Sequence, residues 1–171
     1  FEPFALKRMV YSDGALREVA LWDLVGRSSH ENVRERTIDS LQERFYVDTN
    51  QATRVKVMAA ALFSQVKADW SLNKEASNSL AWAAELHEVG LSIAHSSFHK
   101  HGAYLLQHSD LLGFTRQGQT MLAVLVRNHR RKIQKDEVSV LSKRQQTTAL
   151  QLIRLLRIAV VLNHSRDAHA V

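Results

Sequence analysis

The stretch "QTTALQLIRLLRIAVVL", residues 146–162, decides how this chain folds. After Gln151 its only polar residues are Arg154 and Arg157, and the rest are Leu, Ile, Val and Ala. A helix that is apolar on nearly every side is stable only when other elements cover it. We therefore expect a long helix over about 146–162 that lies centrally among other helices.

The remaining sequence also predicts helices. One proline and six glycines in 171 residues suit helices with short connections, and no strand-like alternation is sustained. Asp48, with Gln51 as a capping-box partner, and Asn73 are placed to cap helices, and Gly90 is placed to end one. The candidate helices cover about 12–26, 31–45, 49–67, 74–89, 97–108 and 117–128. We expect an all-α, compact multi-helix bundle.

Composition limits the class of protein. Hydrophobic residues make up 45% and charged residues 23%, as in globular domains, and no apolar run is long enough to span a bilayer. The absence of cysteine excludes thiol catalysis, disulfides and cysteine-built zinc sites. We expect a cytoplasmic protein, with peripheral association to a membrane left open.

The charge is uneven along the chain. Residues 1–115 hold 12 Lys+Arg against 14 Asp+Glu, whereas residues 116–171 hold 11 against 3, a net of +8. A basic half suits either a polyanion or a solvated face that aids solubility.

A histidine-rich segment, "LHEVGLSIAHSSFHKH" at residues 86–101, allows two interpretations. A hydrolytic metal site needs three or four converging ligands, and His87 and Glu88 supply two. Further ligands would have to come from His95, His99, His101 and His129. The alternative is that His87 is a hydrogen-bonded, partly buried histidine with Glu88 as its charge partner or a helix cap.

A basic run, "RNHRRKIQK" at residues 127–135, contains no acid. Arginine binds phosphate oxygens with two parallel hydrogen bonds and lysine acts as a point charge, so several together suit a chain of phosphates. Few aromatics are present, so we expect no nucleic acid as partner. The candidate phosphate-binding residues are Lys100, His101, Arg127, Arg130, Arg131 and Lys132.

Several segments resemble one known family. They are "DGALREVALWDLVGR", "WAAELHEVGLSIAHSSFHKHGAYLLQHSDLLGF", "LAVLVRNHRRK" and "LIRLLRIAVVLNHSR". Together they resemble the C-terminal part of the exopolyphosphatase / guanosine pentaphosphate phosphohydrolase family, and look closer to its exopolyphosphatase branch. The resemblance implies a degenerate HD-domain fold in which His87 and Glu88 occupy the positions of the HD pair. The set is incomplete, because no histidine lies between Asn32 and Glu85 and Val160 stands where the last Asp would fall.

The resemblance also implies a division of labour. Residues 1–27 resemble the tail of a preceding actin-like catalytic region, which would hold Mg²⁺, and residues 28–171 would form the HD-like domain. This chain would then carry no catalytic residue, metal or cofactor. It would bind inorganic polyphosphate, contact the actin-like domains of its own parent chain and form a homodimer.

Three functions remain in competition. The first is a polyphosphate-binding and dimerisation domain of an exopolyphosphatase, whose parent could also act on guanosine pentaphosphate. The second is an autonomous HD-type metal-dependent nucleotide phosphohydrolase built on His87 and Glu88. The third is a scaffold whose charge serves only solubility.

Overall fold

Helices make up every regular element in the part of the chain that the computed structural model describes, residues 33–165. The first described helix covers residues 33–44. The elements that follow are α2 (Thr49–Val66), α3 (Lys74–Leu86), the 3₁₀ helix η1 (Val89–Ser92), α4 (Phe98–His108), α5 (Arg116–Asn128), α6 (Lys135–Val138) and α7 (Lys143–Leu162). The expectation of an all-α bundle is confirmed.

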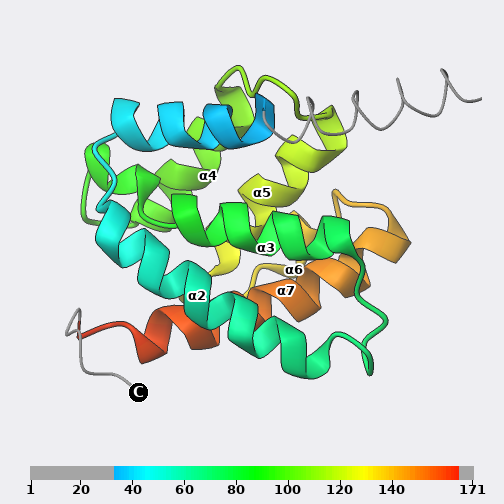
Figure 1. Cartoon of the computed structure of the whole chain (residues 1–171). Coiled ribbons are helices and arrows are strands. Elements are labelled where there is room, and N and C mark those ends of the chain that lie inside the picture. The colour runs from blue at the N-terminus through cyan, green and yellow to red at the C-terminus, as the bar shows by residue number, and fades with distance from the viewer. Residues whose placement is uncertain (1–32, 166–171) are drawn as a thin grey trace, which may run out of the picture.

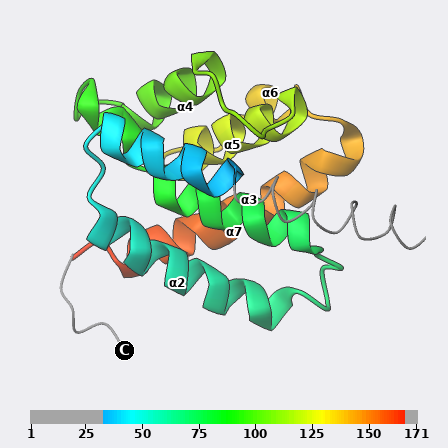
Figure 2. The same cartoon turned by 45° about the horizontal axis from the view of Figure 1, so that its top comes forward.

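Helix α3 runs through the middle of the bundle in both views (Figures 1 and 2). It packs on α2, α5 and α7, while α4 packs on α5 and η1. Small residues on several sides of α3 allow this close approach; Ala83 and Ala84 are both fully buried. The centre of the molecule is therefore shared by α3, the apolar segment 121–126 of α5 and the middle of α7.

Helix α7 fits the sequence prediction in its middle and differs at its ends. It begins at Lys143, three residues earlier than expected, because Ser142 and Gln145 form a capping box. Its middle is buried against α2, α3 and α5. Its last turn is not covered by the described residues, since Val161 is 71% exposed and Leu162 48%.

Two of the predicted helix caps are present. The side chain of Asp48 accepts a hydrogen bond from the backbone N–H of Gln51, and Asn73 does the same for Ala76. The predicted capping-box role of Gln51 is wrong, however. Its side chain is buried and donates instead to the carbonyl of Asn163 at the end of α7 (2.8 Å).

Gly90 does not act as the expected helix stop, because α3 ends earlier, at Leu86. Gly90 lies inside η1, where the chain approaches the first turn of α4. A Cβ at this position would lie 2.0 Å from the carbonyl oxygen of Phe98 and 2.4 Å from the nitrogen of Gly102. The position therefore needs glycine for a close backbone contact between two elements.

Some predictions fall outside the described residues. The helix at 12–26 and the domain boundary at residue 28 belong to this group. None of the described helices is both long enough and apolar enough to cross a membrane.

Candidate functional site

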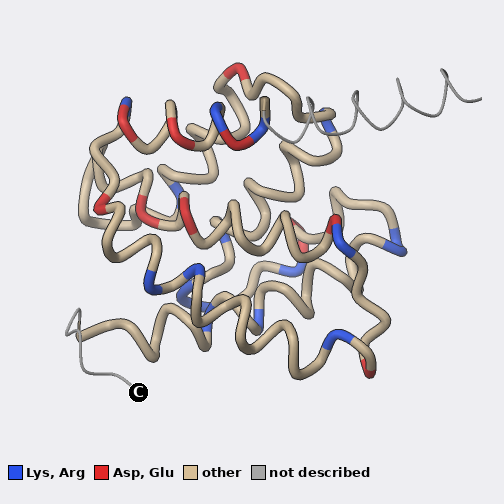
Figure 3. The backbone as a smooth tube through the Cα atoms, in the orientation of Figure 1, with Lys and Arg blue, Asp and Glu red and all other residues tan. Residues whose placement is uncertain are grey.

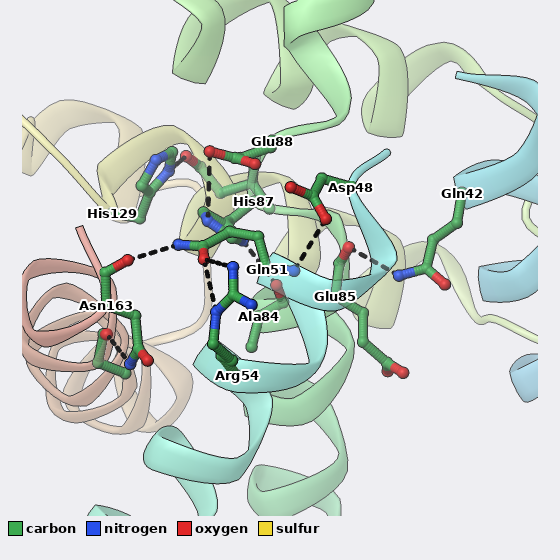
Figure 4. Close-up of polar contacts among 12 residues, drawn as sticks. Gln42, Asp48, Gln51, Arg54, Ala84, Glu85, His87, Glu88, His129 and Asn163 are labelled. Carbon is green, nitrogen blue, oxygen red and sulfur yellow. Dashed lines mark hydrogen bonds and ion pairs between the residues drawn. The ribbon is translucent and has the colours of Figure 1, made fainter. Parts of the chain in front are cut away.

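The His87–Glu88 pair lies directly after α3. His87 is 1% exposed, and its Nδ1–H donates to the carbonyl of Ala84 at 2.7 Å. Its other ring nitrogen, Nε2, lies 4.0 Å from a carboxylate oxygen of Glu88 (Figure 4). The pair thus has the geometry of a hydrogen-bonded, buried histidine beside a carboxylate, which is the alternative to the metal interpretation.

His129 lies directly after α5, as His87 lies directly after α3. It is 2% exposed, its Nδ1–H donates to the carbonyl of Val126 at 2.6 Å, and its ring meets the His87 ring edge-on at a centroid distance of 5.6 Å. Burial, and next the neighbouring His87, lower the pKa of His129 well below its usual value. The ring is therefore neutral, and its Nε2 is a hydrogen-bond acceptor without a partner.

The other predicted histidines separate from one another. His95 and His99 lie in different elements, because α4 begins only at Phe98 and His95 lies in the turn before it. His95 is exposed, whereas His99 is 4% exposed. Burial first, and then the guanidinium groups of Arg127 and Arg130, lower the pKa of His99 to about 4.

The arginines of the basic run, residues 127–135, line two different hollows of the surface. Arg127, in the last turn of α5, pairs with Glu137 of α6 (3.0 Å) and lines a hollow together with Lys100. Arg130 and Arg131 line a different pocket. The reason is that α5 ends at Asn128, so that the residues after it no longer follow helical spacing.

The remaining candidates lie outside that pocket. Lys132 is exposed, and His101 is half-buried within α4. Neither residue lines the pocket that contains Arg130 and Arg131. The six predicted phosphate-binding residues therefore do not line one pocket, and that they form one track for phosphate stays a prediction.

Sequence reasoning missed Arg157 of α7. One of its terminal nitrogens donates to the carbonyls of Asn128 (3.0 Å) and Arg131 (2.6 Å), so it fixes the loop after α5. The signal in the sequence was that Arg154 and Arg157 are the only polar residues between Gln151 and Asn163. In α7 such a side chain must reach solvent or a polar partner at the edge of the core.

These segments enclose a pocket of about 640 Å³. It collects residues from the start of α2, the end of α3, the turn before α4, the loop after α5 and the end of α7. The lining residues used below are His87, Glu88, Phe98, His129, Arg130, Arg131, Arg157 and Val160. We call it the arginine–histidine pocket.

Gln51 connects two of its walls. Its side-chain nitrogen donates to the carbonyl of Asn163, and its side-chain oxygen accepts hydrogen bonds from Arg54 (2.7 and 3.1 Å). Figure 4 shows Gln51 reaching from α2 to the end of α7 beside His87. This buried amide holds α2 and α7 at a fixed distance on one side of the pocket.

The charged side chains that line the pocket are mainly arginines. Arg130 lies over the ring of Phe98, with its guanidinium carbon 4.5 Å from the ring centroid. Within residues 33–165, no carboxylate forms an ion pair with Arg130, Arg131 or Arg157. In Figure 3 most Lys and Arg positions lie in the lower half of the view and most Asp and Glu positions in the upper half.

The geometry supports metal-ion binding less than it supports phosphate binding. Across the described residues, no group of three or more His, Asp or Glu side chains is arranged to hold a metal ion. His87, Glu88 and His129 lie near one another without forming such a set. That the chain holds no metal stays a prediction for metal analysis.

Comparison with known proteins identifies relatives over nearly the whole chain. Residues 33–171 match the model of the Ppx/GppA phosphatase family, domain III. The chain is 39% identical over 168 residues to a guanosine-5'-triphosphate,3'-diphosphate pyrophosphatase of Photobacterium profundum. It is 36% identical over 169 residues to a protein of the same name from Vibrio atlanticus.

These matches cover 98% of this chain but 33% of each relative, so the chain spans about a third of their length. Both relatives are named for a guanosine compound, and neither is named for polyphosphate. They do not support the expectation that the chain is closer to the exopolyphosphatase branch.

Proposed function

Because the chain belongs to the Ppx/GppA phosphatase family and matches its domain III, we propose that it binds the phosphates of the parent enzyme's substrate without cleaving them. The reaction itself would take place in the preceding part of the parent, where we expect the Mg²⁺ and the catalytic carboxylate. This chain contributes affinity for the far end of the substrate.

One observation carries the proposal. Arg130, Arg131 and Arg157 line a single pocket, and no carboxylate of the described chain pairs with them. Unpaired guanidinium groups in a concave site attract phosphate and bind it with charge-assisted hydrogen bonds. Two of the three are held in place, Arg130 on Phe98 and Arg157 by backbone carbonyls, so little conformational freedom is lost on binding.

The substrate we propose is inorganic polyphosphate, with guanosine pentaphosphate as the other candidate. The relatives' names favour the guanosine compound, whereas the several basic residues outside the pocket favour a long chain of phosphates. Either substrate brings several phosphates, which suits a site with more than one guanidinium group.

We also propose that the parent forms a homodimer through this domain. The last turn of α7 exposes Ile158 (46%), Val161 and Leu162 together, which is an apolar surface suited to self-association. A strictly monomeric mass of the parent at micromolar concentration would contradict this part of the proposal.

The test of phosphate binding is a double substitution, Arg130→Ala with Arg131→Ala, in the full-length parent. We expect weaker binding of long polyphosphate and lower processivity, because removal of a distal site costs a long polymer its multivalent advantage. The slope of log affinity against log salt should fall by roughly one for each phosphate-binding arginine removed.

Two single substitutions serve as controls. Arg144→Ala removes an exposed charge at the start of α7, away from the pocket, and should leave binding unchanged. Arg127→Ala should have a smaller effect than the double substitution, since Arg127 is paired with Glu137 and lines another hollow. If the double substitution leaves affinity, salt slope and processivity at the parental values, the pocket does not bind substrate phosphate.

A further inference from the structure

Two buried imidazole nitrogens beside the arginine–histidine pocket find no hydrogen-bond partner among residues 33–165. They are Nε2 of His129, which lines the pocket, and Nδ1 of His99, which lies in the first turn of α4. The two residues are 2% and 4% exposed, and their ring centroids lie 6.3 Å apart. A buried polar atom of this kind costs free energy, which points to a role beyond packing.

Positive charges approach both rings from several elements. The charged neighbours of His99 are Arg127 of α5, Arg130 and Arg131 of the loop after it, and Lys100 of α4. The titratable or charged neighbours of His129 are His87, His99 and Arg130, and Glu88 and Arg157 line the same pocket. Burial first, and then the cations around it, keep a proton off the ring of His99 and lower its pKa to about 4.

Phe98 connects these rings to the arginines of the pocket. The guanidinium carbon of Arg130 lies 4.5 Å from the centroid of the Phe98 ring, and the centroid of the His129 ring lies 5.5 Å from it. The ring of His99 follows at 6.4 Å. Phe98 is buried, so the charge of Arg130 acts on the histidines beside an apolar side chain, where it is screened less than in water.

We infer that binding of a phosphate chain at Arg130 and Arg131 is coupled to the uptake of a proton by the His99–His129 pair. This inference rests on the proposed function, because the arginines that would hold the phosphates are the ones that repel a proton from these rings. A bound anion offsets the charge of the guanidinium groups and therefore favours a protonated ring. The coupling is reciprocal, so a proton on the pair also strengthens binding of the anion.

The same charges fix the direction of the pH dependence. Burial, the largest cause of the low pKa of His99, remains when the anion binds, so above about pH 6.5 both rings stay neutral and do not affect affinity. Below that pH the anion-bound form takes up a proton first, and affinity rises as the pH falls toward 4. An opposite charge beside an ionisable group shifts its pKa by about 1 or more, so binding at about pH 5 should be about two- to fourfold tighter than at about pH 7.5.

The probe is trimetaphosphate, a ring of phosphate units without a terminal group, so that its charge stays constant across this pH range. Calorimetric titration of the 171-residue chain at fixed ionic strength measures the dissociation constant at both pH values. Repeating each titration in two buffers of different ionisation enthalpy gives the number of protons taken up on binding. We expect uptake of a fraction of a proton at the lower pH and almost none at the higher pH.

Two exposed histidines require a reference chain of their own. His95 and His164 also line the pocket and would attract an anion when protonated, so the reference carries His95→Gln and His164→Gln. Adding His99→Gln to it should reduce proton uptake at least about twofold and leave affinity at the higher pH unchanged, and adding His129→Gln as well should abolish the uptake. His108→Gln, at an exposed position of the same helix that does not line the pocket, is the matched control for His99→Gln and should change neither quantity.

The ring signals of His99 and His129 in NMR spectra give a second readout, which needs no substitution. With trimetaphosphate bound they should titrate about one pH unit higher than without it. Identical titrations, or proton uptake that persists after both His99→Gln and His129→Gln, overturn the inference, whereas anion binding that Arg131→Ala weakens keeps the proposed function. No binding of trimetaphosphate at either pH overturns both. If the substituted chains fail to fold by circular dichroism, the ring titrations of the unsubstituted chain decide.

Discussion

Gly90→Ala should destabilise the protein strongly although it adds only a methyl group. The added Cβ would lie 2.0 Å from the carbonyl oxygen of Phe98 and 2.4 Å from the nitrogen of Gly102. Both atoms belong to the backbone of the first turn of α4, so neither can rotate away. The structure must instead separate η1 from α4 by more than about 1 Å to restore ordinary contact distances.

The expected cost follows from that displacement. Overpacking of a close-packed interior typically costs about 1–3 kcal/mol and sometimes more. Because the clash involves backbone on both sides, we expect about 3 kcal/mol, a large part of a total stability of about 5–15 kcal/mol. For a chain of this size each kcal/mol lowers Tm by about 2–4 °C, so Tm should fall by about 6–12 °C.

Gly118→Ala is the matched control. Gly118 lies in the first turn of α5, and the nearest atom to an added Cβ is the hydroxyl oxygen of Thr115 at 3.5 Å, an ordinary contact. Alanine lowers the conformational entropy of the unfolded chain and favours helix, so this variant should gain up to about 1 kcal/mol.

Urea and thermal unfolding followed by circular dichroism measure both variants against the unsubstituted chain. If Gly90→Ala differs from it by less than about 0.5 kcal/mol, the close contact of η1 with α4 is not a constraint on the fold, and the reasoning from Cβ distances fails.

Two further predictions concern buried polar groups. The lowered pKa values of His99 and His129 mean that the unfolded chain binds more protons below pH 6.5, so stability is complete above that pH and falls toward pH 4. For His99 we expect about 1–2 kcal/mol after solvent screening, and His99→Gln should flatten the dependence of Tm on pH in this window. Gln51→Ala leaves the Asn163 carbonyl without its donor and should cost about 2 kcal/mol in urea unfolding, whereas Gln65→Ala, at an exposed position of α2, should change stability by less than about 0.5 kcal/mol.

The sequence predicted those features of the site that depend on residues close together in the chain. Asp48 and Asn73 were placed correctly as caps because a cap bonds a backbone group three residues away. His87 and Glu88 were identified as neighbours at a helix end for the same reason. The division of the basic run was not predicted, since it depends on where α5 ends and on the ion pair of Arg127 with α6.

The sequence by itself determined the helical class, the buried character of the middle of 146–162 and the basic charge of the second half, because periodicity, caps and composition act within a few residues. Only the tertiary structure decided that His87, His129 and Arg157 line one pocket. These residues lie at the ends or on the edges of three helices, α3, α5 and α7. Their distances are set by how the helices cross and how the loops close, and such long-range packing leaves no periodic signal in the sequence.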